Sequence, residues 1–235
     1  MSDQSALTRA QLVRILLVAL VGVAAVLLSV GGMVAYSASV VDELSVQNQA
    51  SLTESRIERR LISLRDDVMS ATVWNEAYKE TLSGNLDWMQ LNYGDYYADY
   101  MDHAVTVAFN GAGLPIYASR DSEPVSLRSE TAFVSAVQPL VEAVRQSAAQ
   151  KLSAKGRQTY GLEAVSTRET TVMVGDEPYF ITVSSVVPEA VDYDQAGASD
   201  PIVVSGISVR AFVATLGPDM MLSEPRLLAA SEPRS

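Results

Sequence analysis

The chain has 235 residues, a formal net charge of −11, no cysteine and a single histidine, His103. These totals exclude disulfides, thiolate catalysis and zinc sites that need cysteine or several histidines. The acidic balance, without any cluster of lysine or arginine, argues against a nucleic-acid partner.

Residues 15–41 contain no charged side chain and are mostly Leu, Val, Ala and Gly. About 20 apolar residues cross the hydrocarbon core of a bilayer, so this segment predicts a transmembrane helix. Two arginines precede it and two acids follow it, which places residues 1–14 in the cytoplasm. A cleaved signal peptide is the alternative, but its apolar region is normally only about 7–15 residues long. We therefore expect an anchor in the inner membrane, with the remainder of the chain outside it.

Residues 40–82 contain neither proline nor glycine and predict one long helix that ends near Gly84. A heptad spacing runs along it through Ile57, Leu61, Leu64, Val68, Ala71, Asn75 and Tyr78, in which Asn75 is the one polar position. Such a seam is typical of a helix that packs along a partner. The partner is either the sheet of the same domain or a second copy of the chain in a parallel homodimer, and the spacing alone does not choose between them.

The segment after Gly84 combines aromatic rings with acids. Two sets share the spacing i, i+4, i+7, so a helix would carry a phenolic face beside a carboxylate face: Tyr93, Tyr97 and Tyr100, and Asp95, Asp99 and Asp102. These acids with His103 form one conceivable cation site, but a solvated acidic helix face is the simpler interpretation, and we expect no metal. His103 is expected to be a hydrogen-bonded residue at a strand edge, with local pH sensing as the alternative.

The rest of the chain predicts an antiparallel sheet with flanking helices. The expected strands are residues 103–109, 114–119, 168–174, 179–187 and 201–209, the first four forming two hairpins. Residues 129–152 have helical periodicity, with a possible break at Pro139. An acidic loop is expected over residues 188–200, a short helix from residue 212, and a tail or linker over residues 218–235.

The order of these signals resembles the fourth type of CHASE domain, an extracytoplasmic sensor module of bacterial signalling proteins. The resemblance covers about residues 60–215. It rests on residues 74–78 late in a long helix, Asn92 before the aromatic segment, the first predicted hairpin with its glycine-rich turn, and Tyr117. It implies an α+β fold in which a transmembrane helix continues as a long signalling helix that packs on an antiparallel PAS-like or Cache-like sheet. Asn75 and Asn110 stand where the family usually has acids, which implies a difference in the ligand that is recognised.

The resemblance implies that residues 42–217 form a periplasmic, ligand-sensing input domain of a membrane-anchored signal-transduction protein. In the family this domain relays ligand binding to a cytoplasmic output domain, often a diguanylate cyclase or cyclic-di-GMP phosphodiesterase, sometimes a histidine kinase. No such region follows here, so we expect the chain to be part of a longer receptor. The alternative is a membrane-anchored periplasmic protein-interaction module without a small-molecule ligand. Nucleotide, hydrolase and metalloprotease motifs are absent, so we expect neither an enzyme nor a cofactor.

Aromatic rings beside acids and amides suit a small-molecule pocket, which needs apolar walls and a few polar anchors. The predicted ligand-binding residues are Trp74, Asn75, Glu76, Tyr78, Trp88, Asn92 and Tyr117. Each ring taken alone is equally a candidate core residue, because tryptophan and tyrosine at helical spacing often pack a helix on a sheet. The sequence does not identify the small molecule.

Overall fold

The computed structural model describes residues 3–153, 156–157, 159–190 and 199–220. The chain divides into two compact units, residues 1–57 and 58–235. Helix α1 (Asp3–Thr72) forms the first unit and contributes its last fifteen residues to the second. In the described part of the chain, no helix combines the length and the hydropathy that a membrane crossing requires.

The predicted continuous helix up to residue 82 is wrong at one point, where Val73 and Trp74 interrupt it. Trp74 is extended (φ −157°, ψ 137°), and α2 (Asn75–Ser83) begins directly after it. Val73 forms a parallel bridge with Val187, and the backbone N–H of Val187 donates to the carbonyl of Thr72. A run of β-branched residues followed by tryptophan favours extended backbone, which explains why the break occurs here. The predicted stop at Gly84 is confirmed, since its φ of 73° is the left-handed conformation that suits glycine.

The aromatic segment forms α3 (Leu86–Met89), the π-helix η1 (Gln90–Asp95) and α4 (Tyr96–Met101). Tyr93 and Tyr97 are fully buried and stack with ring centroids 6.0 Å apart, but Tyr100 is 79% exposed. A π-turn holds more residues than an α-turn, so it rotates everything after it relative to an α-helical pattern. The predicted phenolic face is therefore right for two tyrosines and wrong for the third.

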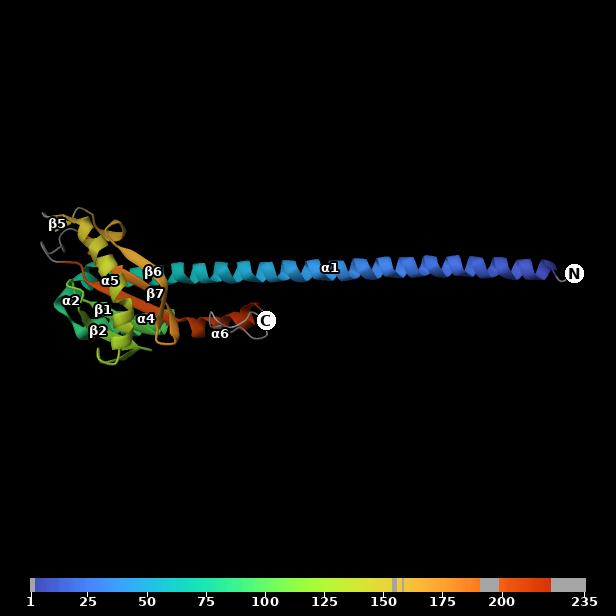
Figure 1. Cartoon of the computed structure of the whole chain (residues 1–235). Helices are drawn as coiled ribbons and strands as arrows, with labels where there is room; N and C mark the ends of the chain where they lie inside the picture. Colours follow the sequence, from blue (N-terminus) through green and yellow to red (C-terminus); the bar gives the residue numbers. More distant parts are fainter. Residues whose placement is uncertain (1–2, 154–155, 158, 191–198, 221–235) are drawn as a thin grey trace. The chain divides into compact units, whose positions relative to one another are not determined.

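Six strands form one sheet whose hydrogen-bonded neighbours are all antiparallel, in the order β3-β2-β1-β8-β7-β6 (Figure 1). The strands are β1 (Val105–Phe109), β2 (Pro115–Arg120), β3 (Glu123–Pro124), β6 (Thr167–Val174), β7 (Glu177–Ser185) and β8 (Ile202–Ser208). All five predicted strands are confirmed, while the two-residue edge strand β3 was not predicted. A separate small hairpin pairs β4 (Leu152–Ser153) with β5 (Gly156–Arg157), and a 3-10 turn, η2, spans Gly161–Glu163.

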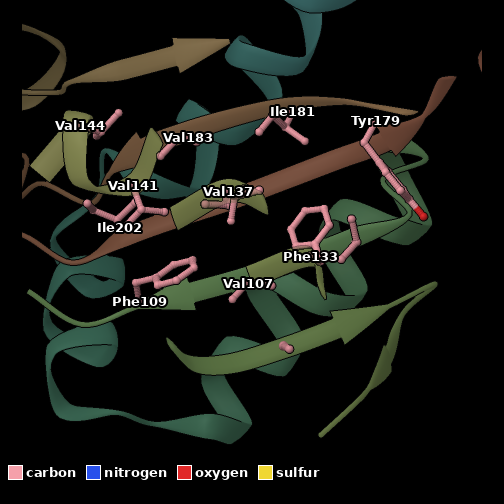
Figure 2. Packing of buried hydrophobic residues seen from close by; sticks show 13 residues of the cluster. Val107, Phe109, Phe133, Val137, Val141, Val144, Tyr179, Ile181, Val183 and Ile202 are labelled. Carbon is pink, nitrogen blue, oxygen red and sulfur yellow. The ribbon is translucent and has the colours of Figure 1, made fainter. Parts of the chain in front are cut away.

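Helix α5 (Thr131–Lys151) covers one face of the sheet. Figure 2 shows Phe133, Val137 and Val141 of this helix facing Val107 and Phe109 of β1. Pro139 does not split α5, contrary to the possible break, and it lies on the exposed side of the helix. At the start of α5 the buried carboxylate of Glu130 accepts two hydrogen bonds from Arg120, at 3.0 and 2.7 Å.

The end of α1, with α2, η1 and α4, covers the opposite face. Val68, Ala71, Tyr78, Tyr93 and Tyr97 pack with Ala108, Tyr117 and Val203 of the strands. Leu64, Val68 and Tyr78 of the heptad seam are fully buried within this unit. From Leu64 onward the seam therefore packs on the chain's own domain, the first of the two arrangements. The predicted homodimer stays a prediction.

Helix α6 (Val209–Met220) follows β8 directly and begins slightly before the predicted helix. Residues 191–198 of the predicted acidic loop and residues 221–235 of the predicted tail lie outside the described residues.

Candidate functional site

The two predicted tryptophans lie side by side on the outside of the helical layer. Their ring centroids are 5.8 Å apart, and Trp88 meets Tyr93 edge-on at 5.3 Å. Trp74 is 38% exposed, Trp88 is half-buried and Tyr93 is fully buried. The pair thus connects the core to solvent, with the indole of Trp74 available for contact.

The predicted polar residues make mostly internal contacts. The side-chain oxygen of Asn75 accepts hydrogen bonds from the backbone N–H groups of Glu189 and Ala190, at 2.8 and 3.1 Å. The amide of Asn92 donates to the carbonyl of Trp88 at 2.9 Å, one turn back. Glu76 is exposed. Asn75 therefore ties α2 to the segment after β7.

Two of the predicted ligand-binding residues are buried. Tyr78 is fully buried in the core. Tyr117 is 5% exposed, and its hydroxyl donates to the side-chain oxygen of Gln90 at 2.8 Å. Burial raises the pKa of Tyr117 to about 12, so this hydroxyl stays protonated and able to donate.

Gln90 is the centre of a polar cluster that the sequence did not reveal. Its amide nitrogen donates to the carbonyl of Ser122 at 2.6 Å and to the carboxylate of Asp95, which also accepts from the Ser122 hydroxyl at 3.0 Å. Asp95 is thereby occupied in holding η1 to the turn after β2. No sequence spacing connects Gln90 with Tyr117 and Ser122, because the contacts form only when η1 packs on the sheet.

A cavity of about 740 Å³ lies elsewhere in the second unit. Its walls come from the last part of α1, from α4 and the turn into β1, from the turn after β2, and from the junction of β8 with α6. Its charged lining residues are Arg60, Asp99, Asp102 and Asp121, and Ile207 and Phe212 contribute apolar surface. None of the predicted ligand-binding residues lines this cavity.

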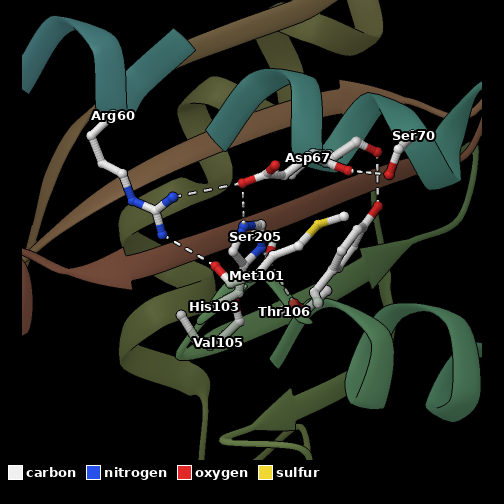
Figure 3. Close-up of polar contacts among 10 residues, drawn as sticks. Arg60, Asp67, Ser70, Met101, His103, Val105, Thr106 and Ser205 are labelled. Atoms are coloured by element: carbon white, nitrogen blue, oxygen red, sulfur yellow. Dashed lines mark hydrogen bonds and ion pairs between the residues drawn. The ribbon is translucent and has the colours of Figure 1, made fainter. Parts of the chain in front are cut away.

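His103 is buried in the wall of this cavity and is the centre of a polar network (Figure 3). Its Nδ1 is hydrogen-bonded to the hydroxyl of Ser205 at 2.7 Å, and its Nε2 lies 3.5 Å from the carboxylate of Asp67. Arg60 lies 3.7 Å from the same carboxylate and donates to the carbonyl of Met101 at 3.1 Å. The network joins α1 to the start of β1, and it confirms that His103 is a hydrogen-bonded residue at the strand edge.

The surroundings of His103 favour a neutral ring. Burial lowers the pKa of His103, the carboxylate of Asp67 partly opposes this effect, and Arg60 adds to it. A carboxylate beside Nε2 favours the tautomer with its proton there, which leaves Nδ1 to accept from the Ser205 hydroxyl. The Tyr97 ring stacks on the imidazole at 5.2 Å and completes its enclosure.

The cation site considered for Asp95, Asp99, Asp102 and His103 does not form as a unit. Asp95 turns to Gln90 and Ser122, whereas Asp99 and Asp102 face the cavity. Within the described ranges, no group of three or more His, Asp or Glu side chains is arranged to hold a metal ion.

Comparison with known proteins identifies a family for this chain. The family model described as the CHASE4 domain matches residues 56–214, about two thirds of the chain. This range begins near the boundary of the second unit and includes the whole sheet, the helices on both faces and the start of α6. No curated protein matches the chain.

Proposed function

The chain belongs to the CHASE4 domain family, whose members are extracellular sensor domains, and from this premise we propose that it senses a small molecule in the periplasm. The family match is the observation that carries the proposal. A sensor domain of this kind is not catalytic, in agreement with the absence of enzyme motifs from the sequence. The family assigns the chain a general role in signal transduction. The binding of a small molecule and the output domain that receives the signal are our proposals.

Anchoring in the inner membrane is part of the proposal and rests on the charge-free residues 15–41. Described side chains in this segment, such as Leu20, Leu28 and Met33, are 69, 77 and 73% exposed. Exposed leucines in such numbers need a covering apolar phase, which a bilayer supplies. A chain without residues 15–41 is expected to leave the membrane fraction, and an intact N-terminus on the membrane-bound chain would separate an anchor from a cleaved signal peptide.

The proposed ligand-contacting surface consists of the accessible predicted residues Trp74, Asn75, Glu76, Trp88 and Asn92, supported from beneath by Tyr78 and Tyr117. The evidence for this surface is the exposed indole of Trp74, which is followed in the chain by Asn75. Asn75 also accepts hydrogen bonds from the segment after β7. A ligand here would change the contacts of α2 and, through Val73 and Thr72, those of α1. Such a ligand moves α1 only if it binds two helix arrangements with different affinity. The signal would then reach an output domain, such as a cyclic-di-GMP enzyme or a kinase, in a longer receptor.

A thermal-shift screen of the full chain in mild detergent tests this proposal, using amino acids, organic acids, polyamines and divalent cations. Ligand binding stabilises the folded state by RT ln(1 + [L]/Kd), about 2.7 kcal/mol at a hundredfold excess over Kd. A shift that disappears in Trp74→Ala and Asn75→Ala, but persists in the matched control Tyr100→Ala, would support the proposed surface. A ligand whose shift survives in both variants would place its site elsewhere.

The protein-interaction module is the second candidate, favoured by apolar side chains on the helical layer that face solvent. Leu86 and Leu91 are 56 and 64% exposed; Leu86 lies on α3 with Trp88, and Leu91 lies on the next helix, η1. Site-specific photo-crosslinking from position 91 in cells would then capture one partner protein, and Leu86→Ser would reduce the yield. Absence of any crosslink, together with a hit in the ligand screen, would remove this candidate.

A further inference from the structure

We infer that Asn110 is a site of spontaneous covalent modification, at which the folded protein converts asparagine to aspartate and isoaspartate through a cyclic imide with Gly111. The site is the turn between β1 and β2, and the inference does not depend on the proposed sensing function. The chain contains five asparagines, and Asn110 is the one that a glycine follows.

The reaction needs only the chain itself and water. The backbone nitrogen of Gly111 attacks the side-chain carbonyl carbon of Asn110, so that a new nitrogen–carbon bond forms and the bond from this carbon to Nδ2 breaks. The proton of the Gly111 N–H passes through solvent to the departing nitrogen, which leaves as ammonia. Water then adds to one of the two carbonyls of the imide. Cleavage at the side-chain carbonyl gives aspartate, and cleavage at the main-chain carbonyl gives isoaspartate.

The turn holds the side chain of Asn110 as an activated electrophile. Its Oδ1 accepts hydrogen bonds from the backbone N–H groups of Ala112 and Leu114, both at 3.0 Å. Attack on the side-chain carbonyl places negative charge on this oxygen, and N–H donors that are already in position stabilise such a charge. The same two bonds fix the orientation of the carbonyl, so less ordering of the side chain is needed for the ring to close.

Gly111 supplies the nucleophile. Its backbone nitrogen forms no hydrogen bond with any residue that the structure describes, whereas the backbone nitrogens of Asn110, Ala112 and Gly113 all donate. Packing requires glycine here, because a Cβ at position 111 would lie 2.4 Å from the carbonyl oxygen of Ser199. The residue after Asn110 therefore has no side chain to obstruct the attack. Neither Asn110 nor Gly111 is buried, so water can reach the imide.

Asn75 shows why the turn matters. Its side-chain oxygen also accepts two backbone N–H groups, from Glu189 and Ala190. However, Asn75 begins α2 and is followed by Glu76, so the helical backbone would have to unwind before the ring could close. Only at Asn110 do the two donors, a non-helical backbone and a following glycine occur together among the described asparagines.

The two products have different effects on the turn. Aspartate keeps an acceptor oxygen at the same place and adds a negative charge, so the hydrogen bonds from Ala112 and Leu114 become charge-assisted. Isoaspartate inserts the side-chain carbon into the main chain, which lengthens the turn and displaces Gly111 from its close contact with Ser199. Ser199 lies on the connection from β7 to β8, so this product disturbs both sides of that contact.

Peptide mapping by mass spectrometry of the full chain in mild detergent tests the inference. The chain is held at mildly alkaline pH, which favours loss of the Gly111 proton, sampled over days and digested at mildly acidic pH. We expect Asn110 to lose its amide at least about tenfold faster than Asn75, the effect of about 1.4 kcal/mol in the barrier. Both aspartate and isoaspartate should appear at position 110. The folded chain should react at least as fast as the chain unfolded in guanidinium chloride, because the two N–H donors are in position only in the folded turn.

Two variants make the test specific. Asn110→Gln keeps an amide but adds a methylene group, so cyclisation would need a larger ring, and the variant should not react over the same period. Asn110→Asp has the charge of the product from the start. In native isoelectric focusing, the wild type should gain an acidic band that migrates with Asn110→Asp, and neither variant should gain a further band.

The inference is overturned if Asn110 keeps its amide in the folded chain while the unfolded chain loses it, or if another asparagine reacts faster. An acidic band that Asn110→Gln gains at the wild-type rate would likewise exclude position 110 as its source. Amide loss that yields aspartate alone would overturn the cyclic imide, because direct hydrolysis forms no isoaspartate.

Discussion

Gly94 lies in the π-helix η1 at a point where the chain has no room for a side chain. A Cβ added there would lie 2.4 Å from the Tyr117 hydroxyl and 2.9 Å from the amide nitrogen of Gln90. In an open helix, alanine is about 1 kcal/mol more favourable than glycine. The close contact reverses this preference, because Tyr117 is hydrogen-bonded to Gln90 and Gln90 is held by Ser122. We expect Gly94→Ala to destabilise the domain by about 1–3 kcal/mol, the usual cost of overpacking.

A second variant identifies the cause. Tyr117→Phe removes the hydroxyl that the new methyl group would meet, and alone it should cost about 1 kcal/mol for the lost hydrogen bond to Gln90. The double variant Gly94→Ala/Tyr117→Phe should therefore cost at least about 1 kcal/mol less than the sum of the two single variants.

Urea unfolding of the full chain in mild detergent, followed by tryptophan fluorescence, measures these free energies. Both tryptophans, Trp74 and Trp88, belong to the second unit, so the signal reports on the domain that contains Gly94. The reasoning is refuted if Gly94→Ala equals or exceeds the wild type in stability, or if the two substitutions are strictly additive.

Three further tests probe the packing and electrostatics of the domain in the same assay. Leu64→Ala should cost about 2–5 kcal/mol because Leu64 is fully buried. Ile62→Ala, at a 41% exposed site on the same helix, should change stability by less than about 1 kcal/mol. Equal effects would argue against packing of the heptad seam on the chain's own domain. Arg120→Ala breaks a two-point contact with a buried carboxylate and should cost about 1–3 kcal/mol. Arg145→Ala removes an exposed ion pair and should cost less than Arg120→Ala; a reversed order would contradict this. Burial lowers the pKa of His103 below its unfolded value of about 6.5, so as the pH falls the unfolded chain binds a proton at His103 before the folded chain does. The stability of the wild type should therefore fall as the pH drops below about 6.5. His103→Gln should lack this part of the pH dependence, and an unchanged pH profile in the variant would show that His103 is not its source.

The sheet was predictable because its signals are local. Each hairpin has alternating apolar residues on both sides of a turn, and such a pattern fits within about twenty residues of sequence. The heptad seam was equally visible, but its partner was not. An apolar seam on a helix predicts that this face is buried, but it does not identify the element that covers it. The choice between the sheet and a second chain required the positions of Ala108 and Val203, which lie far along the sequence.

The break in the long helix shows the same limit. Residues 72–74 have only a weak preference against helix, and that preference decides the structure because Val187 is present to pair with Val73. The contact spans more than a hundred residues, so helix propensity alone predicted a helix that continues to residue 82. Asn75 then acquires a partner in the segment after β7, which its place in a heptad did not indicate.

The sequence analysis treated the three regularly spaced acids as one set on one helix face, whereas the structure divides them between two environments. Because η1 holds an extra residue, Asp95 points to Gln90 and Ser122 and fastens η1 to the sheet, while Asp99 and Asp102 point to the cavity. The cavity wall continues through His103 to Asp67 and Arg60 of α1. The polar side chains of this wall are therefore continuous with the contacts that join α1 to the start of β1. If a ligand of this domain favours one position of α1, that position must raise the affinity for the ligand by the same factor, because such coupling is reciprocal.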